Sequence, residues 1–466
     1  MNFLERIAFV NLEKKGVKLY FKKLSINEES FKSFFAGEIL IYSLIKKILK
    51  KEKIEKKRFL NQSIDFVYIH QANKKRCIEV YNYLNKNNKD LTVIFSDLKF
   101  KGSLDLILRR IINKKHSLGL KIYVKKDKYT FLLQKIKIPT SKILTISYKK
   151  LINVSICYLD EFYDKTISLP KSKNVLNNNL QIFENKINFN SRTKYNLILL
   201  YLSYLKNFFL DRETNKEFNV FYYFKEKEAK KIKTFNKYNS ADPFIVNHSN
   251  SNYVFFEEYN YKKGHISVSK IYENSSEYLG RIIDEKFHLS FPFILKNQSQ
   301  YYLIPESSED NSIKLYSCKS FPMKWEFKMN IINNIDCADS IILKHKNLFF
   351  ILTSERIEGY HNSYKIFYSD KLETNNWKPH KQNPVMINRY SRNAGLFYEK
   401  SKLILVYQQY DFNGYGNNIK LFELNELSES SFKISKLKTN NYTSHNTNNT
   451  HHFTKSKNLF IYDSQN

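Results

Sequence analysis

The sequence has few of the residues that bend or cross-link a chain. Its 466 residues include 10 glycines, 8 prolines and 4 cysteines. The cysteines (Cys77, Cys157, Cys318 and Cys337) stand singly, and no two form a C-x-x-C pair. This arrangement argues against structural zinc and against a secreted fold held by disulfides. We therefore expect neither a metal ion nor another cofactor.

Long apolar segments are also missing. The longest such stretch, residues 197–205 (LILLYLSYL), is too short to span a bilayer and is followed by Lys206. The first 16 residues carry charges where a signal peptide needs an apolar core. These features predict a cytoplasmic protein, with a peripheral position at the inner face of the membrane as a further expectation.

Acidic residues are scarce and unevenly distributed. The chain has 45 Asp and Glu against 77 Lys and Arg. Residues 1–210 carry 42 of the basic and 17 of the acidic residues, so most of the excess lies there. A basic surface can bind nucleic acid, an anionic membrane surface or a phosphorylated carrier, although an AT-rich genome also raises lysine content. Because no nucleic-acid-binding motif accompanies the charge, we expect no nucleic-acid partner.

The second half of the chain contains a repeat made of strand patterns. Each copy opens on polar or small residues, continues into a short apolar strand, crosses a polar turn and returns as an aromatic strand. Equivalent points are Asp242, Phe291, Asp339, Asn393 and His452, with spacings of 49, 48, 54 and 59 residues. An all-strand repeat of this length is typical of a β-propeller blade.

The last repeat ends after a single hairpin, so its remaining strands must come from elsewhere. Residues 217–236 (EFNVFYYFKEKEAKKIKTFN) contain two strand patterns and lie just before the first repeat. Closing the last blade from both ends of the chain removes an open sheet edge. We therefore predict an all-β five-bladed β-propeller over residues 215–466.

The first part of the chain, residues 1–210, has a different pattern. Strand-like runs at 64–70 and 91–97 alternate with helical patterns at 73–86 and 103–113. Three more strand-like runs follow: LGLKIYV, KILTISY and VSICYLD. This alternation predicts an α/β domain of Rossmann type with a largely parallel sheet. The residues show no G-x-G-x-x-G, Walker or D-x-D motif, so they indicate no particular activity.

Polar residues of the repeats mark a candidate site, because the first strand of a blade faces the propeller channel. Asp242 and Asp339 stand at repeat starts, and Glu258 and Glu306 end returning strands. Converging carboxylates can act as base, acid and pKa modulator in glycosidic chemistry. Further donors for sugar hydroxyls or phosphate are His265, His288, Arg392, Gln408, His451 and His452, and Tyr415 is expected to stack on a sugar face. The expected ligand is an oligosaccharide or a glycolipid headgroup. Each residue taken singly also has a structural explanation.

A specific resemblance rests on seven segments that keep their order and spacing. They are ADPF, FFEEYNYKKGHISV, DEKFHLSFPFI, YYLIPESSEDNSIKLYSCKSFPMKWEF, NWKPHKQNPV, RNAGLFY and THHF. Over residues 217–466 the chain resembles the N-terminal propeller of plant glucosamine inositolphosphorylceramide transferases. It also resembles bacterial relatives in which this propeller follows a formyltransferase-like domain. That propeller is similar to five-bladed glycoside hydrolases such as arabinanases, which implies a base-like role for Asp242 and a channel position for Glu258, Glu306 and Asp339.

Departures from the family pattern keep several functions open. Gln409 and Leu396 replace a family Asp and Arg, and Thr454 stands where an Asp is expected. The N-terminal part lacks the catalytic residues of formyltransferases, so it resembles a degenerate copy. The first hypothesis is a carbohydrate-active protein of surface polysaccharide or glycolipid biosynthesis. The alternatives are a non-catalytic glycan-binding or scaffold propeller, and a formyl- or glycosyl-transferring enzyme in which the propeller reads the substrate.

Overall fold

The computed structural model describes two parts of the chain. In the first part, the described residues are 66–69, 92–97, 117–126, 129–139 and six positions between 147 and 162. In the second part, they are 217–465 except 261, 358–359, 411–415, 417 and 439–448. The chain divides into two compact units, residues 1–212 and 213–466, and each is described by itself. Within the described residues, no helix is long and apolar enough to cross a membrane.

The first unit contains a small mixed sheet. Its strands are β1 (Phe66–Ile69), β2 (Thr92–Asp97), β3 (Ser117–Lys126) and β4 (Tyr129–Pro139). β1 and β2 pair in parallel, as two strands of the predicted α/β domain would. β2–β3 and β3–β4 are antiparallel, and the strand at β4 was not predicted. The described strands therefore do not show a largely parallel Rossmann sheet.

The strands predicted from KILTISY and VSICYLD are wrong at the described positions. Ser147, Lys150 and Val154 are helical, and Tyr158 lies in a turn. All four are buried, as is Phe162, and their spacing of three or four residues matches one face of an α-helix. A short apolar run fits either structure, and here the helical period prevails. The predicted helices at 73–86 and 103–113 lie outside the described residues.

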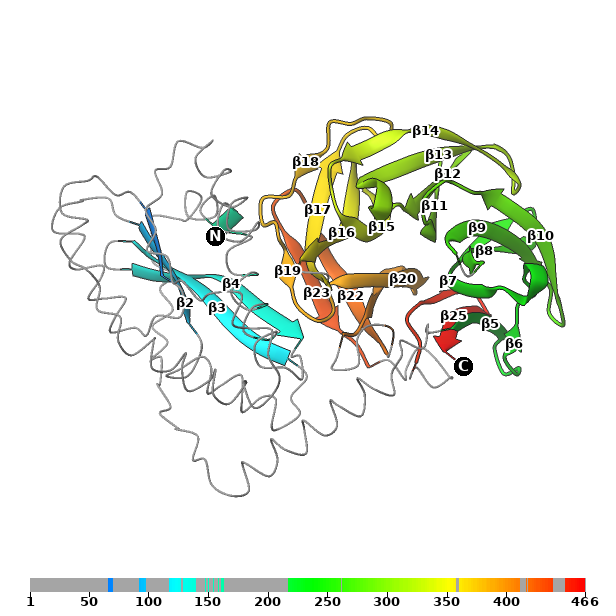
Figure 1. Ribbon diagram of the computed structural model, residues 1–466, viewed down its shortest axis with the longest axis horizontal. Coiled ribbons are helices and arrows are strands. Elements are labelled where there is room, and N and C mark those ends of the chain that lie inside the picture. Colours follow the sequence, from blue (N-terminus) through cyan, green and yellow to red (C-terminus); the bar gives the residue numbers. More distant parts are fainter. Residues whose placement is uncertain are drawn as a thin grey trace, which may run out of the picture. The chain divides into compact units, whose positions relative to one another are not determined.

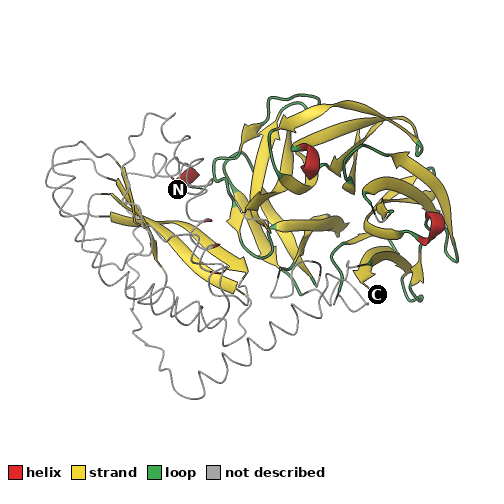
Figure 2. Cartoon of the chain, in the orientation of Figure 1, coloured by secondary structure: helices red, strands yellow, loops and turns green. Residues whose placement is uncertain are grey.

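The second unit is a β-propeller of antiparallel sheets whose strands mostly follow chain order (Figures 1 and 2). The first sheet has β7 (Asn239–His248), β8 (Ser251–Tyr259), β9 (Gly264–Ile271) and β10 (Ser276–Ile283). The second has β11 (Ser290–Asn297), β12 (Gln300–Glu306), β13 (Ser312–Ser320) and β14 (Lys324–Asn333). β15 (Cys337–His345), β16 (Leu348–Ile357) and β17 (Tyr360–Ser369) follow, and β17 also pairs with the short strands β18 (Lys378–Pro379) and β19 (Met386–Ile387).

Two more sheets complete the unit. One has β20 (Arg392–Glu399), β21 (Lys402–Gln408), β22 (Ile419–Leu427) and β23 (Phe432–Lys436). The other combines β24 (Phe453–Ser456) and β25 (Leu459–Gln465) with β5 (Phe218–Phe224) and β6 (Lys230–Lys231). β5 pairs antiparallel with β25 along its whole length, which confirms that residues before the first repeat complete the last one. The first strands contact one another in the closed order β7, β11, β15, β20, β24 and back to β7.

Blades are buried on both faces, which explains their aromatic middle strands. Val254 and Phe256 pack toward β5 and β25, whereas Phe255 between them packs toward Leu303 of the next blade. All three of these β8 side chains are fully buried. Because both faces of β8 are covered by neighbouring blades, the middle of the strand is continuously apolar instead of alternating.

A bulge near the start of the first strand gives each of four blades a common geometry. The register of β7 breaks between Ala241 and Phe244, and the same break occurs in β11, β15 and β20. In three of these bulges the first unpaired residue has a positive φ, which is 51° for Asp242, 47° for Phe291 and 54° for Asp339. Bulges redirect side chains and are frequent next to functional sites.

The position of the bulge in β20 shows that the repeat alignment predicted from the sequence is wrong by one residue in this blade. It leaves Ala394 and Gly395 unpaired, so the equivalent of Asp242 is Ala394 and not Asn393. Gly395 has a φ of 106°, and a Cβ there would lie 2.4 Å from the Phe453 carbonyl oxygen. Only glycine fits this turn.

Candidate functional site

Asp339 and Arg392 form the centre of the candidate site. They are distant in sequence but come from β15 and β20, which lie against each other. Arg392 Nε donates to Asp339 Oδ2, and its Nη2 donates to Asp339 Oδ1 at 3.3 Å. The same Nη2 lies 3.5 Å from Glu306 Oε2, at the end of β12. The amide of Gln408, from the end of β21, donates to Asp339 Oδ2 at 3.2 Å.

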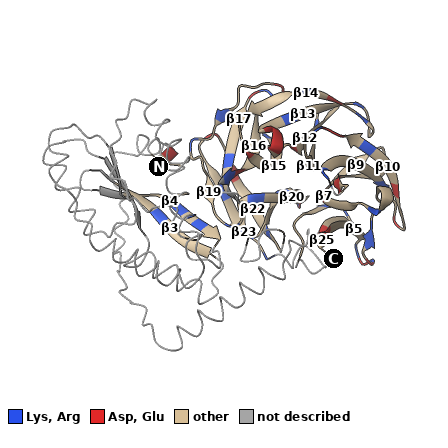
Figure 3. Cartoon of the chain, viewed as in Figure 1, with Lys and Arg blue, Asp and Glu red and all other residues tan. Residues whose placement is uncertain are grey.

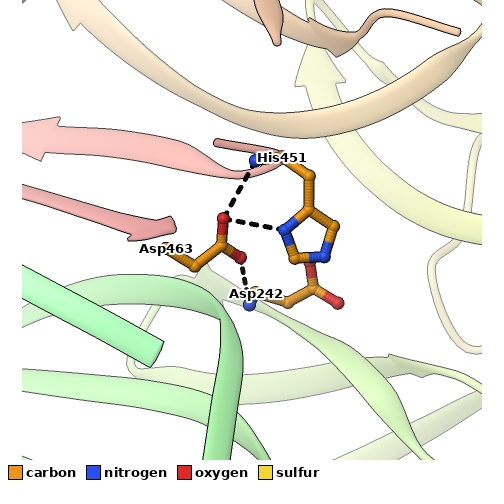
Figure 4. Close-up of side chains that lie close together, drawn as sticks. All are labelled: Asp242, His451 and Asp463. Carbon is orange, nitrogen blue, oxygen red and sulfur yellow. Dashed lines mark hydrogen bonds and ion pairs between the residues drawn. The ribbon is translucent and has the colours of Figure 1, made fainter. Parts of the chain in front are cut away.

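Asp242 lies beside two histidines that precede β24. Its Oδ1 is 3.6 Å from His451 Nε2 and 3.5 Å from His452 Nδ1. On the other side of the imidazole, His451 Nδ1 is 2.7 Å from Asp463 Oδ1, so His451 lies between two carboxylates (Figure 4). All four side chains are buried.

Asp463 organises this part of the backbone. Its Oδ2 accepts the N–H of Asp242 at 3.0 Å. Its Oδ1 accepts the N–H groups of His451 and His452 at 3.1 and 2.8 Å. One carboxylate from β25 thus fixes both the Asp242 bulge and the histidine pair. A buried carboxylate that accepts several N–H groups is strongly held.

The pKa values of Asp242 and Asp339, the two carboxyls at repeat starts, are shifted in opposite directions. Burial alone would raise the pKa of Asp242, but His451, His452 and Arg392 outweigh burial and hold it at about 2. Burial raises the pKa of Asp339 well above its usual range. Glu306 and Asp242 raise it further, and Arg392 opposes them. Burial lowers the pKa of His451, whereas Asp463 and Asp242 raise it above its usual value. These mutual effects place Asp242, Asp339, Glu306 and Arg392 in one electrostatic cluster.

Several polar atoms of the cluster lack hydrogen-bond partners within the described part of the chain. They are Asp242 Oδ1, Gln408 Oε1 and both ring nitrogens of His452. The His452 ring packs edge-on against Phe244 and Phe291, with centroids 4.7 and 5.3 Å away. Buried polar atoms without partners are costly, and in a native structure they often mark a place where a ligand or water binds.

Glu258 and His265 do not belong to this cluster. Glu258 Oε2 accepts from His265 Nε2 at 3.0 Å, from Ser267 Oγ at 3.0 Å and from the Tyr278 hydroxyl at 2.9 Å. Its Oε1 accepts the Phe235 N–H at 2.7 Å. The hydrogen-bond partners of this pair all lie in the first blade or in the segment leading to it. These donors hold the Glu258 carboxylate within its own blade, and a cavity shared by Glu258 and Asp242 stays a prediction.

Two predicted residues remain, His288 and Tyr415. His288 is partly exposed, lies 3.2 Å from Glu257 Oε1 and accepts the Gly264 N–H at 2.9 Å. Glu306 and Glu257 both act on the pKa of His288, which lies near 9, although burial opposes them. His288 therefore borders the axial cluster without joining it. Tyr415 lies outside the described residues.

Asp463 was not predicted, although the repeat contained the signal. It occupies the end of the returning strand β25, as Glu306 does in β12 and Gln408 in β21. The strand-end rule that selected Glu306 would have selected it too. Its role as an acceptor of backbone N–H groups from two other segments follows only from their proximity in the fold.

Among the residues that the structure describes, one group of side chains has the spacing to hold a metal ion. The ligand atoms of Asp242, His451 and Asp463 all lie within 4.8 Å of one another. Asp463, however, already accepts three backbone N–H groups and lies against His451 Nδ1. A carboxylate whose lone pairs face N–H donors is a poor metal ligand. The donor set therefore fits an internal hydrogen-bond network better than a metal centre.

The fold and this cluster define a class: a β-propeller with buried carboxylates at its axis. Residues 227–463 match the family described as "Glucosamine inositolphosphorylceramide transferase 1, N-terminal", and the chain belongs to this family. The predicted resemblance to it is thereby confirmed.

Comparisons with individual proteins cover smaller parts. Glucosamine inositolphosphorylceramide transferase 1 of Arabidopsis thaliana is 31% identical over 205 residues, which are 41% of this chain and 26% of that protein. The protein of the same name from Oryza sativa subsp. japonica is 30% identical over 206 residues, 41% of this chain and 27% of its own length. Most of each relative therefore lies outside the match.

Solved structures give looser matches. An α-L-arabinanase of Cellvibrio cellulosa complexed with arabinohexaose has a TM-score of 0.34 at 13% identity, covering 42% of this chain and 77% of its own. A thermostable family-43 glycoside hydrolase has a TM-score of 0.37 at 12% identity, covering 47% of this chain and 85% of its own.

Proposed function

We propose that the chain is a carbohydrate-active protein of surface polysaccharide or glycolipid biosynthesis. In this proposal the propeller has five blades, with β15–β17 as the third, and holds a glycan at its axis. Residues 215–466 form this propeller, and residues 1–210 form the α/β domain. The observation that carries the proposal is the buried axial cluster, where Asp242 Oδ1 and Gln408 Oε1 have no hydrogen-bond partner among described residues. The names of the relatives support a glycolipid or oligosaccharide ligand.

The separated pKa values suit proton transfer. Asp242, with its pKa held at about 2, is ionised at neutral pH and can accept a proton. Burial raises the pKa of Asp339, so Asp339 is the member of the pair that carries a proton more readily. Two carboxyls with opposed pKa shifts are the usual basis of acid–base division in glycosidic chemistry. We assign Asp242 as the base and Asp339, with Glu306, as the groups that modulate or donate the proton.

A second candidate is a non-catalytic glycan-binding propeller. Arg392 contacts Asp339 with two nitrogens and also approaches Glu306. Such an ion pair neutralises the carboxylates that would serve as acid. Gln408 adds an amide donor to Asp339, and an amide cannot transfer a proton in catalysis. A transferase activity of the N-terminal unit and the location in the cytoplasm or at the inner membrane face both stay predictions.

Substitution of Asp242 by Asn separates the two candidates. Asn keeps the shape of the side chain but cannot accept a proton as a base. If the site is catalytic, Asp242→Asn abolishes hydrolysis of a nitrophenyl glycoside panel while binding to a glycan array persists. Asp284→Asn is the matched control, since Asp284 forms ion pairs with Lys263 and Arg281. Full activity of Asp242→Asn would remove the catalytic assignment, and absence of glycan binding by the unaltered protein would remove both candidates.

A further inference from the structure

Three cations in or beside the β20–β23 blade lie close to Tyr390 and, in the part of the chain that the structure describes, have no carboxylate partner. Basic and acidic residues are interspersed over the propeller strands (Figure 3). In this blade Lys402 Nζ lies 2.9 Å from Glu423, and Lys433 forms an ion pair with Glu426. Arg389, Lys420 and Lys436 have no such partner: within the described residues, no ion pair joins any of them to a carboxylate.

Two of the three cations lie over the ring of Tyr390. Arg389 Cζ lies 5.0 Å from the centre of the Tyr390 ring, and Lys436 Nζ lies 5.4 Å from it. The same ring packs against Phe422, with centroids 5.9 Å apart. Lys436 is directly opposite Phe422 in the β22–β23 register, and Lys420 is two residues before Phe422 on β22. Opposed and alternate residues share one face of a sheet, so the cations gather around one ring.

Their grouping is electrostatically unfavourable without an anion. Burial lowers the pKa of Lys420, and Lys436 and Arg389 lower it further. The hydrogen bond recorded for its ammonium goes to the neutral Asn418 side chain at 3.3 Å. Arg389 and Lys420 are partly buried and Lys436 is exposed. The repulsion between such like charges is relieved when an oppositely charged group joins them.

The cluster lies at the same end of its blade as the axial site. Gln408, which contacts Asp339, is opposite Arg392 on one side and Ile419 on the other. Lys420 follows Ile419 directly. The Arg389 carbonyl accepts the N–H of Tyr410 at 2.9 Å, two residues beyond Gln408.

We propose that Arg389, Lys420 and Lys436 bind a phosphoryl group on the ligand whose sugar occupies the axial site. This inference rests on the proposed glycan site and adds the chemical class of its ligand. A phosphoryl group offers several charged acceptor oxygens, so it can engage a guanidinium and two ammonium groups together. The phosphate can belong to a lipid headgroup or to a soluble phosphorylated sugar.

Calorimetric titration of the full chain with inorganic phosphate tests the site. We expect binding by the unaltered protein and a loss of about tenfold in affinity for each cation replaced, as with other charge-assisted contacts. The test variant is Arg389→Gln/Lys420→Gln/Lys436→Gln. The control, Lys365→Gln/Lys402→Gln/Lys433→Gln, removes the same charge from lysines that have carboxylate partners. No phosphate binding by the unaltered protein, or equal weakening in both triple variants, overturns the proposal.

A second experiment, binding to lipid vesicles, identifies the source of the phosphate. Retention on phosphatidylcholine vesicles that contain phosphatidylinositol, lost in the test variant and kept in the control, supports a lipid headgroup. Phosphate binding without vesicle retention supports a soluble ligand. Glycan binding is measured separately on an array. Phosphate binding with no glycan binding defeats the proposed function but leaves the anion site, whereas glycan binding without phosphate binding defeats the anion site alone.

Discussion

Asp242 and Glu258 are buried carboxylates on neighbouring strands of one blade, yet their surroundings differ. Glu258 receives one backbone and three side-chain donors, so both of its oxygens have partners. Asp242 Oδ1 has no hydrogen-bond partner among the described residues and faces two histidines at 3.5 and 3.6 Å. A satisfied carboxylate stabilises the fold, whereas one with an open oxygen is available to a ligand. Burial and residue type alone do not separate these roles.

The largest expected effect on stability is at Glu258. Glu258→Gln places an amide group among several donors and removes a buried charge, so we expect a loss of about 3 kcal/mol in the free energy of unfolding. Urea denaturation followed by tryptophan fluorescence measures it. Glu277→Gln, at an exposed position of β10, should change the value by less than about 0.5 kcal/mol. Equal effects of the two substitutions would show that the Glu258 cluster does not stabilise the blade.

Asp463→Asn should lower both the stability of the fold and the binding of a glycan. The new amide faces the N–H groups of Asp242, His451 and His452, so about 2 kcal/mol of stability is lost. Because these N–H groups fix the Asp242 bulge, glycan binding should weaken as well. Denaturation and glycan-array binding are measured together, with Asp370→Asn at an exposed loop as control. Normal glycan binding in a destabilised Asp463→Asn protein would mean that the bulge does not depend on Asp463.

The pH dependence of stability should distinguish Asp242 from its Asn variant. The fold lowers the pKa of Asp242 from 3.8 to about 2. A lowered carboxyl pKa stabilises the folded state above the unfolded value, and this contribution, about 2 kcal/mol, disappears as the pH falls through the folded value. The difference in unfolding free energy between the protein and Asp242→Asn should therefore shrink between about pH 4 and pH 2. A difference that stays constant over this range would contradict the lowered pKa.

The smallest effect is expected from metal ions. Since the Asp463 oxygens already face N–H donors, Ca²⁺, Zn²⁺ and a chelator should leave the Tm unchanged. Differential scanning fluorimetry measures this directly. A Tm increase with either ion that is absent in His451→Gln would instead establish a metal centre at Asp242, His451 and Asp463.

The repeat could be predicted because its signal is local. Apolar strands, polar turns and aromatic returns recur along the chain, so the strand order and the pairing of β5 with β25 followed from the sequence. The first unit was less predictable. The run around Val154 has strand-like composition, but its buried residues follow a helical period. Short apolar runs do not by themselves decide between these structures.

The site was predicted only in part. Repeat starts and strand ends selected Asp242, Asp339, Glu306, Arg392 and Gln408, and the last four are in direct contact. The same rule also selected Glu258, whose partners lie within its own blade, and it passed over Asp463. The β20 bulge lies one residue later than the sequence alignment predicted, so Ala394 and not Asn393 is equivalent to Asp242. Bulges change which residue faces the axis, and the sequence pattern does not specify them.

The sequence by itself determined the repeated blades and their closure, because strand patterning and turn residues act over a few neighbouring positions. Tertiary structure alone decided which carboxylates form a site. Asp339 and Gln408 are 69 residues apart, and Asp242 and Asp463 are 221 apart, yet each pair is joined by a hydrogen bond. Such contacts arise only when the blades close around their axis. The charge state of each buried carboxyl then depends on the donors that closure brings within reach.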